Sequence, residues 1–101
     1  MQNVRMMNVA WMNCDLVIDY DKDPATGAFK QHKKIQDTMM KDQSSWIDLS
    51  TIEGLKPLAV IQVRVDAHQP QTAEPLRYNK NGQTATYQFS GTLFKSWLTK
   101  M

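Results

Sequence analysis

Three aspartates at alternate positions are the first residues whose spacing could bind a ligand. Asp19, Asp21 and Asp23 match the start of a calcium-binding loop, in which side-chain oxygens at alternate positions coordinate the ion. Such a loop needs glycine at its sixth position and glutamate at its twelfth, where this chain has Pro24 and Lys30. The sequence therefore predicts no calcium site, and the aspartates are interpreted as the solvated face of a strand.

Zinc binding and nucleophilic catalysis lack the residues that they need. The chain has one cysteine, Cys14, and two histidines, His32 and His68, none of them at the short spacing of zinc ligands. Cys14 lies on the apolar side of an alternating pattern, where a thiol is usually a small, unreactive hydrophobe. The four glycines are too far apart to form a phosphate-binding loop. We predict no catalytic residue, no metal and no cofactor, and we do not expect an enzyme.

Length and composition limit the remaining classes. The chain has 101 residues, which predicts a single domain over 1–101. The formal net charge is only +2, which does not require a nucleic-acid or membrane partner. No apolar stretch reaches signal-peptide or membrane-span length, and a lone cysteine forms no internal disulfide. We therefore expect a cytoplasmic protein that does not bind membranes.

The clearest element signal is a period of two near the N-terminus. Even-numbered residues from Val4 to Tyr20 are apolar or aromatic, with Asn8 as the one exception. Because successive side chains of a strand point to opposite faces, this pattern predicts a strand with one buried face. The run is longer than an ordinary strand, so it is either two strands broken near Asn13 or one long, bent strand with a bulge.

The next segment, 28–41, is compatible with two structures. Asp23-Pro24 begins a predicted turn that Gly27 closes. After it, apolar residues such as Ile35 and Met39 recur at helical spacing, but the segment could also be the second arm of a hairpin. We favour a helix, because most hairpin registers place lysines opposite apolar residues.

The second half of the chain contains one clear strand and two further predicted elements. Alternation over Leu58–His68 predicts a central strand. Asn81-Gly82 favours a tight hairpin turn, which would pair Tyr78 with Ala85 and Leu76 with Tyr87. An apolar stripe over 91–100 predicts a terminal helix; it consists of Leu93, Phe94, Trp97 and Leu98.

Together these elements predict an α+β fold. We expect a mainly antiparallel sheet of about four or five strands, with helices near 28–41 and 91–100 packed on one face. The leading functional hypothesis is a non-enzymatic binding or assembly module that acts through protein contacts, either with a second copy of the chain or with another protein. Its candidate interface is Met7, Val9 and Trp11, an apolar row on the otherwise polar face of the first strand.

Two alternative functions rest on other residues. Single-stranded nucleic-acid binding would use a basic segment, two arginines on wet strand faces and one or more aromatic residues of the sheet. The basic residues are Lys30, Lys33, Lys34, Arg64 and Arg77. A small-ligand pocket between sheet and helices would be lined by Trp46, Tyr87 and Trp97. The sequence does not identify a partner or a ligand.

Overall fold

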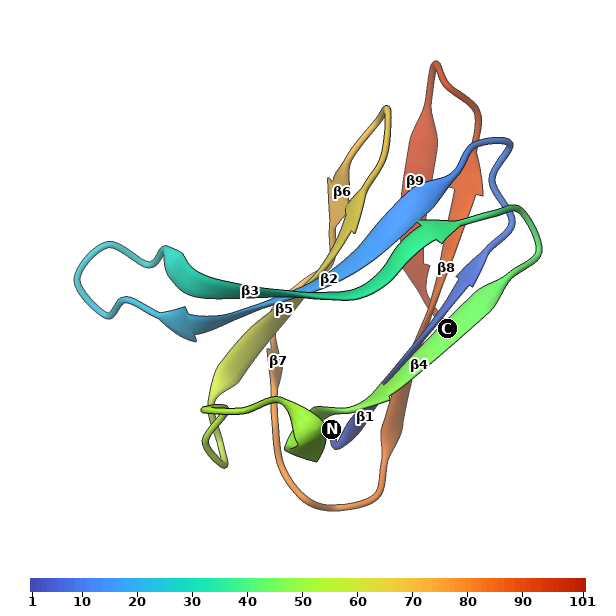
Figure 1. Cartoon of the computed structure of the whole chain (residues 1–101). Coiled ribbons are helices and arrows are strands. Elements are labelled where there is room, and N and C mark those ends of the chain that lie inside the picture. Colours follow the sequence, from blue (N-terminus) through green and yellow to red (C-terminus); the bar gives the residue numbers. More distant parts are fainter.

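The protein consists of two β-sheets whose inner faces share one hydrophobic core (Figure 1). The computed structural model describes all residues, Met1–Met101. The strands are β1 (Asn3–Asn8), β2 (Cys14–Lys22), β3 (Phe29–Met39), β4 (Ser44–Asp48), β5 (Val60–Asp66), β6 (Gln71–Thr72), β7 (Leu76–Arg77), β8 (Thr84–Gly91) and β9 (Ser96–Lys100). One 3₁₀ turn, η1 (Leu49–Thr51), is the only helical element.

The first sheet has the strand order β4-β1-β8-β9. β1 and β8 run parallel and lie in the middle, although about eighty residues separate them in the chain. β4 pairs with β1 and β9 pairs with β8, both antiparallel.

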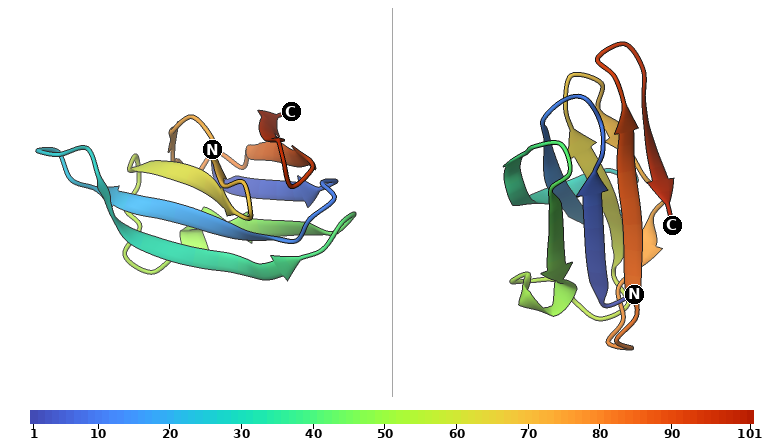
Figure 2. Two further views of the ribbon diagram at one scale, coloured as in Figure 1. Left: turned by 90° about the horizontal axis from the view of Figure 1, so that it is seen from above. Right: turned by 90° about the vertical axis from the view of Figure 1, so that its right-hand side faces the viewer.

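The second sheet has the order β3-β2-β5-β6, with β7 pairing farther along the same edge of β5. All of its pairs are antiparallel. The hairpin of β2 and β3 is the longest in the molecule, and its turn extends beyond the rest of the sandwich (Figure 2).

The core forms where alternate residues of both sheets face inward. Ile61, Val63 and Val65 of β5 are fully buried, as are Val4 and Met6 of β1. These belong to one cluster of 17 buried residues that spans both sheets. Period-two burial of this kind on two facing sheets is the pattern of a β-sandwich.

Two sequence predictions about strands are confirmed. The N-terminal alternation is two strands, β1 and β2, interrupted over residues 9–13. The predicted central strand is β5, which lies between β2 and the β6–β7 edge. The turn after Asp23 is also present, with Gly27 in the left-handed region at φ +77°.

The predicted α+β fold is wrong, because both predicted helices are strands. Segment 28–41 contains β3, an edge strand that pairs with β2. Lys34 and Lys33 do lie opposite the apolar residues Val17 and Ile18. The Lys34 ammonium reaches Asp15, and His32 pairs with Asp19. An exposed edge strand tolerates lysines, so the helical spacing of its few apolar residues was coincidental.

The C-terminal predictions fail for a related reason. Segment 91–100 is the turn of the β8–β9 hairpin and β9 itself, not a helix. Asn81-Gly82 does not join two paired strands, because β7 pairs with β5 while β8 pairs with β1 and β9. The turn instead carries the chain from one sheet to the other. No helix of this chain could cross a membrane.

Candidate functional site

Three loops that carry exposed apolar side chains meet at one end of the sandwich. Residues 9–13 join β1 to β2, residues 40–43 join β3 to β4, and residues 92–95 join β8 to β9. Figure 1 shows all three beyond the strand ends at the upper right. We call these three loops the loop end. In β-sandwiches, loops gathered at one end of a rigid framework are a common place for binding.

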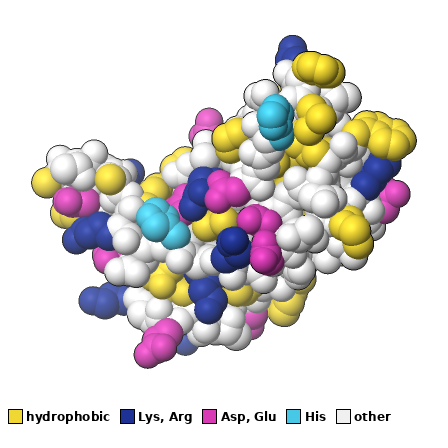
Figure 3. Space-filling view, turned by 45° about the horizontal axis from the view of Figure 1, so that its top comes forward, with side chains coloured by type: hydrophobic (Ala, Val, Ile, Leu, Met, Phe, Trp, Pro, Cys, Tyr) yellow, Lys and Arg dark blue, Asp and Glu magenta, His cyan; other side chains and the backbone are white.

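The side chains of the loop end are unusually apolar for a water-exposed surface. Trp11 is 74% exposed and Phe94, in the β8–β9 turn, is 92% exposed. Met40 and Leu93 are each about half exposed. Figure 3 shows hydrophobic side chains at this end of the molecule, beyond a region in which charges of both signs alternate. Several large apolar side chains exposed at one end of a protein often mark a contact surface.

Asn8 fixes the position of two of these loops. It is fully buried, and its side-chain amide donates hydrogen bonds to the carbonyl oxygens of Met12, at 3.0 Å, and Met39, at 2.8 Å. Its side-chain oxygen accepts a bond from the Ala10 N–H at 2.9 Å. Asn8 is the polar exception in the alternating pattern, and a polar residue at a buried position is expected to have such partners.

Trp11 is held by contacts to the last residue of β8 and to the 40–43 loop. Its backbone N–H donates to the carbonyl oxygen of Gly91 at 3.0 Å. The Lys41 ammonium lies 4.5 Å from the centre of the indole ring and also donates to the carbonyl oxygen of Val9 at 3.1 Å. A cation over an indole face at this distance is attractive, so the exposed ring is pre-organised.

The candidate interface residues therefore occupy different positions. Trp11 is at the loop end, and Val9 is half-buried at its base. Met7 is half-buried on β1, so the three do not form one row along a strand. Sequence reasoning missed Met40, Leu93 and Phe94, because it assigned them to helices.

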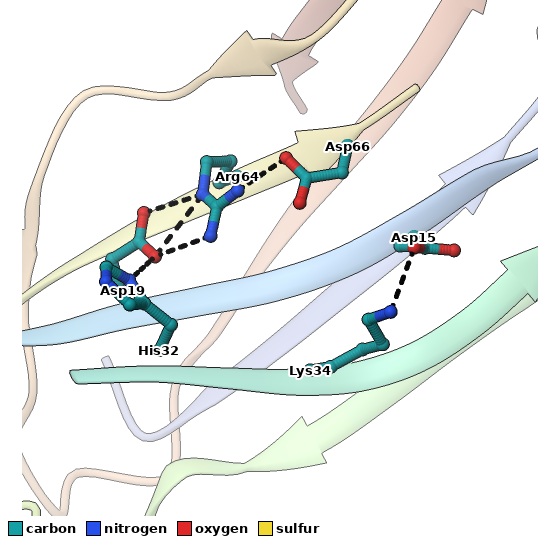
Figure 4. Close-up of polar contacts among 6 residues, drawn as sticks. All are labelled: Asp15, Asp19, His32, Lys34, Arg64 and Asp66. Atoms are coloured by element: carbon teal, nitrogen blue, oxygen red, sulfur yellow. Dashed lines mark hydrogen bonds and ion pairs between the residues drawn. The ribbon is translucent and has the colours of Figure 1, made fainter. Parts of the chain in front are cut away.

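A separate polar array covers the outer face of the second sheet (Figure 4). Asp19 of β2 is only 5% exposed. Arg64 of β5 donates from Nε to Asp19 Oδ2 at 3.0 Å and from Nη2 to Oδ1 at 3.1 Å, and it also pairs with Asp66. The His32 Nδ1 lies 2.7 Å from Asp19 Oδ1. The hydrogen bond to Asp19, followed by that to Asp66, raises the pKa of Arg64.

Two of the five cations that were candidates for nucleic-acid binding are paired with aspartates on this face. Arg64 is bound to two aspartates and Lys34 pairs with Asp15 at 3.2 Å. Arg77 donates to the Leu58 carbonyl oxygen at 2.8 Å from the opposite edge of the sheet. Lys30 and Lys33 are exposed on β3. Because the carboxylates lie among the cations, the structure does not gather these five residues into one positive surface.

The three aromatic residues of the candidate pocket are also apart. Tyr87 is buried in β8, whereas Trp46 of β4 is 55% exposed and Trp97 of β9 is 49% exposed. The Lys95 ammonium lies 5.4 Å from the centre of the Trp97 ring. The helices that were expected to form the other wall of that pocket are absent.

Comparison with solved structures shows this fold in larger proteins. A structure described as a Gram-negative toxin has a TM-score of 0.58 and 13% identity, listeriolysin O has 0.59 and 15%, and pneumolysin has 0.55 and 10%. Each match covers 99% of this chain. The chain has the fold of one part of these proteins.

The likeness extends to the fold alone. The matched region is 22% of the toxin, 22% of listeriolysin O and 23% of pneumolysin, so the chain spans less than a quarter of their length. No protein-family model matches the chain, and no curated protein is similar to it in sequence.

Asp15 should make the free energy of unfolding depend on pH in the acidic range. The Thr38 N–H donates to its carboxylate at 2.8 Å, and this bond, together with Lys34, lowers the pKa of Asp15. A lowered pKa in the folded state stabilises the fold above the unfolded pKa of about 3.9, and this stability is lost as the pH falls through the folded value. We expect Asp15→Asn to lower the free energy of unfolding by about 0.5–1 kcal/mol near neutral pH.

Urea unfolding at several pH values tests this expectation. The difference between wild type and Asp15→Asn should shrink as the pH falls through the lowered pKa of folded Asp15, and it should disappear once both forms carry an uncharged side chain. A difference that stays constant over this range would show that the charge of Asp15 is not the cause.

Cys14 should be unreactive in the folded protein. It is 2% exposed, and burial, followed by the charge of Asp15, raises the pKa of its thiol to about 11. Because the thiolate is the reactive form, we expect native Cys14 to react with an aromatic disulfide reagent at least about a hundredfold more slowly than in urea. Equal rates in the two conditions would contradict this.

No cluster of His, Cys, Asp and Glu side chains suited to a metal ion is present.

Proposed function

We propose that the chain is a non-enzymatic assembly module in which two copies associate through their loop ends. The observation that carries the proposal is the exposure of Trp11 and Phe94 on loops that other contacts hold in place. Burying a side chain of this size stabilises a complex by about 1.5–3 kcal/mol. A pre-organised aromatic side chain also loses little conformational entropy on binding, which makes it a typical interface anchor.

The charges of the loop end favour a second copy as the partner. Lys41 and Asp42 are adjacent on one loop, with 3.7 Å between the ammonium and the nearer carboxylate oxygen. In a two-fold dimer the same patch contributes to both sides. Lys41 of one copy can therefore face the partner's Asp42, while the apolar side chains meet between them. The loop end is thus complementary to itself in both charge and hydrophobicity.

Sedimentation velocity over a range of about 5–500 µM tests the proposal. Wild type should pass from monomer to dimer as concentration rises. The double variant Trp11→Ser with Phe94→Ser should raise the dissociation constant at least about tenfold. Trp46→Ser is the matched control, since it removes an exposed tryptophan from β4, away from the loop end, and should leave association unchanged. A wild type that stays monomeric throughout would overturn the proposal.

A lipid surface is the second candidate partner. The β8–β9 turn presents Leu93 and Phe94 beside Lys95, and apolar tips with a neighbouring cation are typical of segments that insert at a membrane interface.

Flotation with vesicles separates the two candidates. Vesicles of phosphatidylcholine alone and with added phosphatidylserine should carry the protein upward if the loop end binds lipid, and the double variant should remain below. A protein that dimerises but does not float with either vesicle would exclude the lipid candidate. A monomer that floats would replace the assembly proposal with the lipid one.

A further inference from the structure

A cleft lies where the outer edge of the second sheet is interrupted. Segment 71–78 runs along β5, but it pairs regularly only at β6 and β7. Between them, Glu74 and Pro75 leave the edge, and Pro75 has no N–H to donate to a ladder. The space between residues 72–76 and the β8–β9 hairpin forms a cleft of about 450 Å³. This volume lies in the range of small-molecule sites.

Tyr87 lines this cleft and has an unusual environment. The residue is 1% exposed, and its hydroxyl is the one buried side-chain polar atom of the protein that has no hydrogen-bond partner. Burial raises the pKa of Tyr87 to about 12, so the hydroxyl stays protonated and can donate a hydrogen bond. Buried polar groups nearly always have partners, and an unpartnered one beside a cleft suggests that a ligand supplies the partner.

The other residues that line the cleft define the chemistry of such a ligand. Leu76 and Leu98, both half-buried, offer apolar contact on opposite sides. Glu74 and Lys100 are exposed and contribute one charge of each sign, and neither makes an ion pair in the protein. Lys100 of β9 lies directly opposite Tyr87 of β8 in the ladder, so the residues that carry the ammonium and the hydroxyl are neighbours across the two strands.

We propose that this cleft binds a short zwitterionic peptide with an apolar side chain. The peptide ammonium would meet Glu74, its carboxylate would meet Lys100, and its apolar side chain would pack between Leu76 and Leu98. The amide carbonyl would accept the hydrogen bond of Tyr87, which needs a small shift of the lining side chains to reach it. This proposal concerns a different site from the loop end, and peptide binding in the cleft does not depend on self-association.

Titration of isotopically labelled protein with alanyl-leucine, followed by two-dimensional NMR, tests the proposal. We expect chemical-shift changes centred on residues 72–76 and on Tyr87, Leu98 and Lys100. N-acetyl-alanyl-leucine lacks the ammonium and alanyl-leucine amide lacks the carboxylate, so each should bind more weakly than the free dipeptide. No shift at tens of millimolar dipeptide, or equal affinity for the free and capped forms, would overturn the proposal.

Conservative variants show whether the named side chains act directly. Lys100→Gln should weaken binding of the free dipeptide and leave binding of the amide unchanged. Glu74→Gln should weaken binding of the free dipeptide and leave binding of the acetylated form unchanged. Tyr87→Phe should weaken the dipeptide by about three- to tenfold, the usual range for one hydrogen bond.

Tyr87→Phe also separates a ligand role from a structural one. Without ligand, this variant should unfold at an equal or higher urea concentration than wild type, because it removes an unpartnered polar atom. A lower midpoint would mean that the hydroxyl serves the fold, and it would overturn the role assigned to Tyr87.

Discussion

Replacing Arg64 with methionine is expected to lower the free energy of unfolding by about 3 kcal/mol. Arg64 makes two hydrogen bonds of 3.0–3.1 Å, one to each carboxylate oxygen of Asp19, whose side chain is 7% exposed. Removing the guanidinium leaves this carboxylate in a poorly hydrated position with only His32 beside it. A buried charge without its partner is among the most destabilising features that a point mutation can create.

Two comparisons by urea unfolding separate this cause from simple loss of packing. Asp66→Asn removes the other, more exposed partner of Arg64 and should change stability by less than about 1 kcal/mol. The double variant Asp19→Val with Arg64→Met should be more stable than Arg64→Met alone, since it removes the stranded carboxylate as well. If the double variant is the less stable of the two, burial of the Asp19 charge is not the reason for the loss.

Asn8→Ala is the second substitution with a large expected effect, about 3–5 kcal/mol. The Asn8 side chain makes three buried hydrogen bonds to backbone groups of Ala10, Met12 and Met39. Alanine leaves all three groups without partners in a place that water does not reach, so the loss exceeds that of an ordinary hydrogen bond.

The effect of Asn8→Ala should be local as well as global. Hydrogen exchange should accelerate in residues 9–13 and 39–43 more than in β5, because the lost bonds position the loops. Asn3→Ala is the matched control, since its amide makes only long, exposed bonds of 3.4–3.5 Å, and it should change stability by less than about 0.5 kcal/mol. A loss of similar size in both variants would argue against the role assigned to Asn8.

Strands with one buried face could be predicted from the sequence, because local alternation is enough to define them. β1 and β5 bury alternate residues as predicted, whereas β2 buries Leu16–Asp19 in succession because its outer face is covered as well. The parallel pairing of β1 with β8 could not be predicted, since it depends on contacts between distant residues rather than on a local pattern. For the same reason Asn81-Gly82, a strong local hairpin signal, did not reveal that β8 had other partners.

β3 was predicted wrongly because its sequence is consistent with two structures. Ile35 and Met39 are four residues apart, which suits one face of a helix, and they are also its most buried residues apart from Phe29 at the strand start. What decides for a strand is the row of aspartates on β2 that pairs with its basic residues, Asp15 with Lys34 and Asp19 with His32. The acidic and basic segments were visible separately, but only the antiparallel pairing of β2 with β3 brings them together.

The loop end was partly accessible from the sequence. Trp11 was identified as an apolar residue on a polar face, and it is exposed. Asn8 carried an unused signal, since a lone asparagine in an apolar alternation indicates a buried hydrogen-bonding role. Phe94 was missed because its apolar neighbours suited a helix, whereas Gly91 adopts φ +116° and lies where a Cβ would be 2.2 Å from the Lys95 carbonyl oxygen. That crowding is the mark of a tight hairpin.

Hydrogen–deuterium exchange at low and high protein concentration tests the central claim most directly. If the loop ends of two copies associate, residues 9–13, 40–43 and 92–95 should exchange more slowly at high concentration, while the outer faces of both sheets and the β9 edge remain unchanged. Exchange that does not depend on concentration, or slowing confined to a sheet edge, would contradict the claim that these loops are the contact surface.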